Sequence, residues 1–273
     1  MNTDEVLAAP ILSHGAYVCG RAEPGVETRS LATLAIPELV ERLRLVNEFA
    51  GAPPPSAVGS VAFLRGAVAA TREIADHGVA QATWIVHVWS KESNAIEEFL
   101  EGTQKLLAAV AQTRILRGVV KAKTYTGAAM NRWAYERAVV QQPGAAMPNA
   151  YLIPLSKTAE WWSKDWMERH TYFLPRYDDA GRMADRGHAL VAEAGISCML
   201  RRTYRAFEHP APAGSYDFIT YFECADADVP VLEQVCESLR DVKQNREWAY
   251  VREGPTWRGR RVPQWADLFV TRA

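Results

Sequence analysis

The sequence predicts an α+β protein made of two similar halves, because one order of predicted elements occurs twice along the chain. Each half reads strand, helix, strand, strand, helix, strand, which is the ferredoxin-like order. Turn-rich segments with proline and glycine separate these elements. We therefore expect a tandem ferredoxin-like repeat of the dimeric α/β-barrel type, with antiparallel sheets covered by helices. Residues 1–127 would form the first half, 128–148 a linker and 149–273 the second half.

Strand-like apolar runs alternate with helical spacing in the first half. Pro37 stands in the first turn of a predicted helix over residues 36–50, where a missing N–H is tolerated. Three prolines at positions 53–55 then interrupt the chain. Ser93 is suited to cap a second helix over residues 93–112. The predicted strands of this half cover residues 16–20, 60–68, 82–90 and 116–125.

The second half repeats this order. A strand over residues 150–155 precedes a predicted helix over 178–194, and Gly195 is placed to end that helix. Strands over 196–207 and 216–223 follow, joined by the turn-rich stretch HPAPAGS. A helix over 229–240 and a strand over 247–253 complete the pattern.

The composition is that of a soluble globular protein, with 48% hydrophobic and 23% charged residues. A formal net charge of −1 gives no electrostatic case for nucleic acid or an anionic membrane as partner. The chain has no apolar run near the ~20 residues that span a bilayer, and its acidic N-terminus does not resemble a secretory signal. We expect a cytoplasmic protein, with a mature periplasmic form as the alternative. Four cysteines without a CxxC pair argue against zinc.

Two of the six histidines could ligate a metal. His188 lies in the predicted helix 178–194 on a face of small and apolar residues, which leaves room for a large flat ligand. His170 lies in the aromatic stretch WMERHTYFLP. From the residues alone, a structural role remains the alternative for both.

Arg201 follows an apolar run on a strand that we expect to be central. A buried guanidinium needs an anionic partner, which could be Glu223, Asp217 or a bound anion. Tyr125 ends the last strand of the first half and could lie in the core or in a pocket. The nucleotide-binding and hydrolase motifs GxGxxG, GxxxxGK[ST], HExxH and GxSxG do not occur.

The segment YLIPLSKTAEWWSK places Trp161 and Trp162 close to Lys157, directly after a short strand. Two adjacent indoles suit a flat, apolar ligand with anionic edges. IPLSKTAEWW followed by YDFITYFE resembles the chlorite dismutase family. GVVKAKTY resembles that family's strand ending in a tyrosine near the haem, and DVKQN resembles the segment after its last helix. The matches occur in the family's order and cover the second half of the chain best.

The resemblance implies haem b bound between the sheet and helices of the C-terminal half. It implies that His188 is the proximal iron ligand, because the family's distal arginine follows its ligand by thirteen residues and Arg201 stands at that distance. The same distance after His170 reaches Met183, which does not fit. The positions that match other haem-pocket residues are Tyr125, Lys157, Trp161 and Trp162.

The implied activity is conversion of chlorite to chloride and dioxygen through a ferryl intermediate. Arg201 would attract the small anionic or peroxide-like substrate through charge-assisted hydrogen bonds. The alternatives are a divergent haem enzyme on the same scaffold, peroxidase-like or biosynthetic, and a haem carrier or sensor without turnover. The resemblance also implies a homo-oligomer, either a pentamer or a dimer.

The chain departs from the family at two positions. Gln244 stands where the family has a glutamate that accepts a hydrogen bond from the proximal imidazole, unless the register shifts to Glu247. A neutral amide would polarise the imidazole less and raise the iron potential. Glu253 stands where a tryptophan is expected.

Overall fold

The structure is a computed structural model that describes residues 10–67, 77–121 and 137–270. In the described part of the first half there are five strands, several short helices and the longer helix α4. Its elements are β1 (Ile11–Ala22), α1 (Thr28–Ala32), α2 (Ile36–Arg42), β2 (Val46–Asn47), η2 (Glu48–Ala50), β3 (Gly59–Gly66), α3 (His77–Ala80), β4 (Trp84–Ser90), α4 (Ser93–Leu107) and β5 (Ala111–Lys121).

The second half repeats this order with additional short elements. They are β6 (Asn149–Lys157), α6 (Ala159–Ser163), α7 (Trp166–Thr171), β7 (Arg176–Tyr177), β8 (Met183–Asp185), α8 (Gly187–Ala192), η4 (Glu193–Gly195), β9 (Met199–Arg205), β10 (Phe218–Cys224), η5 (Asp226–Asp228), α9 (Val229–Arg240), η6 (Arg246–Tyr250), β11 (Val251–Glu253), β12 (Trp257–Val262) and η7 (Trp265–Phe269). Among the described residues, no helix combines the length and apolar character needed to cross a membrane.

Eight of the described strands close into a barrel. Their order is β10-β9-β5-β1-β4-β3-β12-β6, and β6 pairs with β10 to complete the ring. Neighbouring strands of the ring are antiparallel. The seam between β5 and β9 is held by the single pair Val119 and Arg205. The predicted α+β fold, with paired ferredoxin-like sheets, is confirmed.

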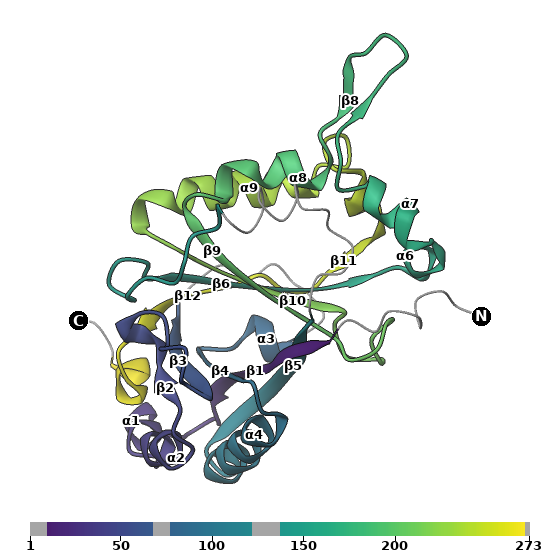
Figure 1. Ribbon diagram of the computed structural model, residues 1–273. Helices are drawn as coiled ribbons and strands as arrows, with labels where there is room; N and C mark the ends of the chain where they lie inside the picture. Colours follow the sequence, from purple (N-terminus) through teal and green to yellow (C-terminus); the bar gives the residue numbers. More distant parts are fainter. Residues whose placement is uncertain (1–9, 68–76, 122–136, 271–273) are drawn as a thin grey trace.

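Three apolar clusters lie between the layers of the fold. One fills the space between the first half's strands and α1, α2 and α4, and includes Phe63, Trp84 and Phe99. The second lies inside the barrel. The third lies between strands β6, β9 and β10 and the helices α8 and α9, which lie side by side over this sheet in Figure 1. Helices thus cover opposite outer faces of one barrel.

The end of the chain returns to the first half. Strand β12 pairs with β3, and Trp265 in η7 is fully buried in the cluster beneath α1 and α2. The sequence analysis did not predict β12 or η7. Trp265 gives its Nε1–H to the carbonyl of Leu31 at 2.7 Å, so the last residues complete the core of the first half.

Several predicted helices are wrong in extent. The predicted helix 178–194 is instead the hairpin of β7 and β8 followed by the short helix α8. Asp178 explains the difference, because its side chain accepts hydrogen bonds from the N–H groups of Ala180 and Arg182 and so stabilises a turn. In Figure 1 this hairpin projects beyond α7 and α8.

The other differences are smaller. Helix α4 ends at Leu107, and Ser93 is its first helical residue rather than its cap. Helix α2 ends at Arg42 instead of continuing to residue 50. Most of the predicted strand 247–253 is the three-ten helix η6. Helix α9 has the predicted bounds.

Candidate functional site

The start of helix α8 is held by carbonyl groups from two other segments. The N–H groups of Arg186 and Gly187 both donate to the Gln244 carbonyl at 3.1 Å, and the His188 N–H donates to the Tyr172 carbonyl at 3.2 Å. Gly187 adopts φ +66°, and a Cβ there would lie 2.3 Å from the Leu174 carbonyl oxygen. Only glycine accommodates both this conformation and this close approach. The backbone therefore fixes the position of His188.

The His188 imidazole is hydrogen-bonded to a buried carboxylate. Its Nδ1 lies 2.8 Å from Glu247 Oε2, and the Lys157 ammonium binds Oε1 of the same carboxylate. The side chains of Lys157 and Glu247 are 4% and 8% exposed, whereas that of His188 is 24% exposed. Burial alone would raise the pKa of Glu247, but His188 and Lys157 outweigh it and lower the pKa to about 2. Glu247 is thus an ionised acceptor for an Nδ1–H, which leaves Nε2 as the nitrogen available to a metal.

The predicted role of Gln244 as the imidazole's acceptor is wrong. The Gln244 side chain donates to Asp241 at 3.0 Å, and its backbone carbonyl receives the first N–H groups of α8. The segment after α9 is irregular and turns so that Glu247, three residues later, faces His188. The alternative register, with Glu247 as the partner, is the one that the structure adopts.

The two tryptophans have different surroundings. Trp161 is 4% exposed, and the Lys157 ammonium lies 4.3 Å from its ring centroid. Trp162 stacks on His209 and Phe218 and directs its Nε1–H to Asp217 at 3.3 Å. Trp161 therefore packs beside the Lys157–Glu247 pair, while Trp162 packs over Phe218, the first residue of β10.

Arg201 lies on the face of β9 that the helices α8 and α9 cover. Side chains alternate along a strand, and Met199, two residues earlier, packs in the cluster beneath these helices. Its neighbour across the ladder on β10 is Phe222, which belongs to the same cluster. Arg201 is exposed, and no hydrogen bond or ion pair joins its side chain to another described residue.

The expected ion pairs of Arg201 are taken by other groups. Glu223 points to the opposite face of β10 and binds Arg261 at 2.8 Å, and Asp217 accepts the Lys157 backbone N–H at 2.7 Å. A free guanidinium on a helix-covered face can bind a small anion. Anion binding by Arg201 therefore remains a prediction.

Among the described residues, Glu253, His170 and His87 make no hydrogen bond, ion pair or ring contact with His188. Tyr125 falls outside the described residues. Glu253 binds Arg240 of α9 and Thr256. His170 lies on α7, and His87 is fully buried inside the barrel, where its Nε2 is 2.8 Å from the Tyr204 hydroxyl.

The sequence analysis missed two groups close to His188. The Phe173 ring centroid lies 5.2 Å from that of the imidazole. Asp185, 5% exposed, binds both Arg176 and Arg246 and so ties the hairpin to the segment that carries Glu247. An acidic residue three positions before a candidate ligand was a weak signal, because its partners lie in other segments.

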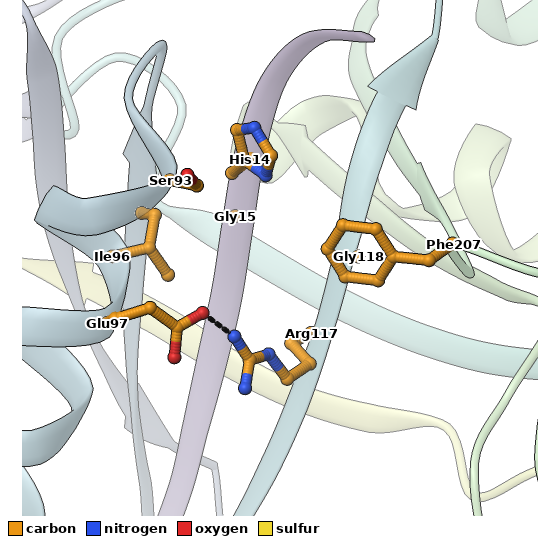
Figure 2. A pocket seen from close by; sticks show the side chains of 8 residues that line it. All are labelled: His14, Gly15, Ser93, Ile96, Glu97, Arg117, Gly118 and Phe207. Atoms are coloured by element: carbon orange, nitrogen blue, oxygen red, sulfur yellow. Dashed lines mark hydrogen bonds and ion pairs between the residues drawn. The ribbon is translucent and has the colours of Figure 1, made fainter.

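Two cavities formed by the described residues lie elsewhere. One of about 260 Å³ lies outside the barrel between β1, β5 and the start of α4, and Figure 2 shows His14, Arg117 and Phe207 around it, with Arg117 paired to Glu97. The other, of about 210 Å³, reaches Glu48 inside the barrel. Neither cavity is lined by His188 or Arg201. The candidate site is therefore defined by the contacts of His188 with Glu247 and by the place of Arg201 on β9, and not by a cavity.

No family model matches the sequence, and no curated protein matches it. Solved structures do match along nearly the whole chain. The chlorite dismutase of Candidatus Nitrospira defluvii in complex with imidazole is 19% identical, covers 97% of each chain and gives a TM-score of 0.66. A tryptophan-to-phenylalanine variant of that enzyme in complex with cyanide is also 19% identical, covers 98% of each chain and gives the same TM-score.

The chain has the chlorite dismutase fold. At this identity the likeness concerns the fold, and it includes the two halves, the closed sheet and the outer helices. The chlorite dismutase fold therefore accounts for the order of elements that the sequence analysis predicted.

Proposed function

We propose that this protein is a haem b-dependent oxidoreductase of the chlorite dismutase type, with chlorite or a similar small oxidised anion as substrate. The observation that carries the proposal is the His188–Glu247 hydrogen bond at 2.8 Å on the helix side, with a partner-free Arg201 on the sheet face below the helices. Histidine ligation backed by a carboxylate, together with an anion-binding arginine, is what such a reaction requires.

The described residues fit a haem group in two respects. His188 is partly exposed and keeps Nε2 for iron, because Glu247 occupies Nδ1. The sheet face around Arg201 bears Thr203, Thr220 and Phe222, which are only partly buried beneath the helices. A mixed apolar face of this kind suits a flat macrocycle. Imidazole and cyanide, both ligands of haem iron, are bound in the two Nitrospira structures.

Each protein group then has a defined task. His188 would bind the iron through Nε2, and its Nδ1–H would donate to the Glu247 carboxylate, which makes the imidazole a stronger electron donor. Lys157 keeps Glu247 ionised and in place. Arg201 would hold the anion, and later its oxygen-depleted fragment, by charge-assisted hydrogen bonds. Bound haem supplies the redox chemistry of oxygen transfer.

Arg201 favours an enzyme over a haem carrier. A carrier gains nothing from an unpaired guanidinium on the face that haem would cover, since desolvating it without an anion is costly. Glu247 also removes the reason for expecting a raised iron potential, because an ionised acceptor stabilises the oxidised iron. A peroxidase-like reaction on the same scaffold remains the second candidate, favoured by the same two residues.

Haem binding and oxygen release test the proposal separately. Purified protein loaded with haem should show a Soret band, and His188→Ala should weaken or shift it. An oxygen electrode should record dioxygen release from chlorite, and Arg201→Ala should reduce it about 100-fold, as for loss of one preorganised donor. Arg252→Ala, which removes an exposed arginine on β11, is the matched control and should keep the activity.

The outcomes divide the proposal clearly. An unchanged Soret band in His188→Ala would contradict the ligand assignment. Loaded protein that releases no dioxygen from chlorite, yet oxidises a dye with peroxide, would replace the first candidate by the second. Equal losses in Arg201→Ala and Arg252→Ala would remove the specific role of Arg201.

A further inference from the structure

The mouth of the barrel contains a second, unassigned cavity. An eight-stranded barrel has an interior just wide enough for side chains or one small ligand, and barrel mouths are common ligand sites. The cavity of about 210 Å³ is lined by the inward-facing Ser60, Trp89 and Arg202, by Glu48 and by the three prolines at 53–55. Lys91 stands at its rim. This place is separate from His188, because Arg202 lies on the face of β9 opposite to Arg201.

Arg202 is the charged group on which the site depends. Its side chain is 19% exposed, and one nitrogen lies 3.2 Å from each oxygen of Glu48. Burial alone would lower the pKa of Arg202, but Glu48 and the neighbouring tyrosines raise it, so the guanidinium stays charged. A planar guanidinium can bind a carboxylate through two parallel hydrogen bonds.

Glu48 is the counter-ion of Arg202 and still leaves charge for a further anion, because Lys91 adds a second positive charge to the cavity lining. One carboxylate oxygen accepts from Ser60 and Arg202, and the other accepts from Arg202 and from Gln141 at 2.9 Å. The Lys91 ammonium, by contrast, donates to a single protein group, the Pro55 carbonyl at 3.2 Å. The Lys91 ammonium therefore keeps N–H groups that can donate to a ligand.

The groups around the cavity carry more positive than negative charge. The charged residues that line it are Arg202, Lys91 and Glu48, two positive groups against one negative group. Arg261 Nε, deeper in the barrel, has no hydrogen-bond partner among the described residues. An anion at the mouth would be attracted by this excess of positive charge.

Part of the cavity wall is apolar. Trp89 is partly buried and packs against the cluster inside the barrel, and the prolines at 53–55 also line the cavity. Indole and proline rings favour planar ligands. We propose that this cavity binds a small planar carboxylate, with its carboxylate on Arg202 and Lys91 and its body against Trp89.

Calorimetric titration with benzoate tests the proposal on the haem-loaded protein and on the protein without haem. Benzoate should bind to both forms, and benzamide, which has the same shape without the charge, should bind at least tenfold more weakly. The site does not need haem, so failure of the proposed haem function leaves this test intact.

Variants locate the binding. Arg202→Lys keeps a positive charge beside Glu48, so the fold should survive, but loss of the planar fork should weaken benzoate binding by a factor of ten or more. Lys91→Ala should weaken it roughly fivefold, the usual scale for an exposed ion pair. Lys105→Ala, which removes an exposed lysine of α4, is the matched control and should bind as the parent does.

Three results would overturn the proposal. Benzoate and benzamide could bind equally well, or neither could bind. Lys91→Ala and Lys105→Ala could weaken binding to the same extent, which would indicate a general charge effect. Binding could be lost in Arg201→Ala and kept in Arg202→Lys, which would place benzoate on the other face of β9.

Discussion

Glu247 joins two charged or ionisable neighbours in a site that is almost closed to water. Lys157 and His188 contact different oxygens of its carboxylate, and the side chain is 8% exposed. A buried ion pair is costly to form, but removing one partner is costlier, because the other charge then lacks compensation. The arrangement therefore makes Glu247 necessary for local stability as well as for orienting the imidazole.

Replacement of Glu247 by glutamine should destabilise the protein by about 3–5 kcal/mol, because the Lys157 ammonium would stay buried without a counter-charge. Gln244→Ala should change stability by less than about 0.5 kcal/mol, since Gln244 contacts the start of α8 through its backbone carbonyl, which the substitution keeps. Urea denaturation of both variants measures the difference. The double variant Lys157→Met, Glu247→Gln should recover part of the loss, and no recovery would contradict the ion-pair account.

Glu223 should make stability depend on pH. Burial raises the pKa of this carboxyl to about 7 in spite of Arg261, whereas the unfolded chain titrates near 4.5. Its contribution is fully present below about pH 4.5 and is lost as the pH rises through about 7. Relative to Glu223→Gln, the parent should lose about 3 kcal/mol over this window.

The free energy of unfolding, measured by denaturation at several pH values, checks this expectation. Glu237→Gln, which changes an exposed residue of α9, serves as the control and should follow the parent's pH profile. Parallel profiles for the parent and Glu223→Gln would show that Glu223 is ionised across the range.

Helix α8 is the element on which the candidate site depends most. It has six residues, too few for an independent helix, and carbonyl groups of Gln244, Tyr172 and Phe173 hold its first turn. Asp185 adds ion pairs to Arg176 and Arg246 directly before it. Tertiary contacts, rather than helix propensity, therefore place His188.

Gly187→Ala tests how strictly this element is positioned. The new Cβ would lie 2.3 Å from the Leu174 carbonyl oxygen in a backbone conformation with φ +66°, so α8 must shift. Haem binding should weaken and the protein should lose more than about 2 kcal/mol of stability. Gly181→Ala is a matched control, because Gly181 has φ +74° but no atom within 4 Å of the added Cβ.

Gly181→Ala should cost only about 1 kcal/mol and leave haem binding unchanged. Thermal denaturation and haem titration distinguish the two variants. Equal effects at both positions would show that the conformation alone matters and that the contact with Leu174 does not fix the helix.

At the scale of the whole molecule, both halves contribute strands to one barrel, and the segment from β12 to η7 packs against the first half. The β6–β10 pairing closes the ring, and the segment from β12 to η7 crosses back to pack with α1 and β3. Because each half contributes to the other's core, we expect one cooperative unfolding transition.

Trp265→Ala tests this sharing. The side chain is fully buried and contacts Phe63, Trp84 and Phe269, so its removal should cost about 3–5 kcal/mol. Haem absorbance and circular dichroism should report the same lowered midpoint, although Trp265 lies far along the fold from His188. Val270→Ala, at a position 54% exposed, should have little effect. Separate midpoints for the two signals would contradict a shared core.

The sequence by itself determined the elements whose pattern is local. Helix α9 has the predicted bounds, and the predicted strands occur at least in part, except that most of 247–253 is a three-ten helix, because apolar periodicity depends on neighbouring residues. It also indicated His188, Lys157 and Arg201 through a family resemblance and a fixed spacing. Tertiary structure decided the rest. Closure of the barrel, the return of β12 and the short α8 depend on contacts between distant segments.

The same reason separates Gln244 from Glu247. Gln244 precedes the three-ten helix η6 and Glu247 lies within it, so no single period relates the directions of the two side chains. Only the packing of η6 against α8 and β6 brings Glu247 to both His188 and Lys157. Likewise, Arg201 and Arg202 are neighbours in sequence, but strand pleating sends one to the helix-covered face and the other into the barrel.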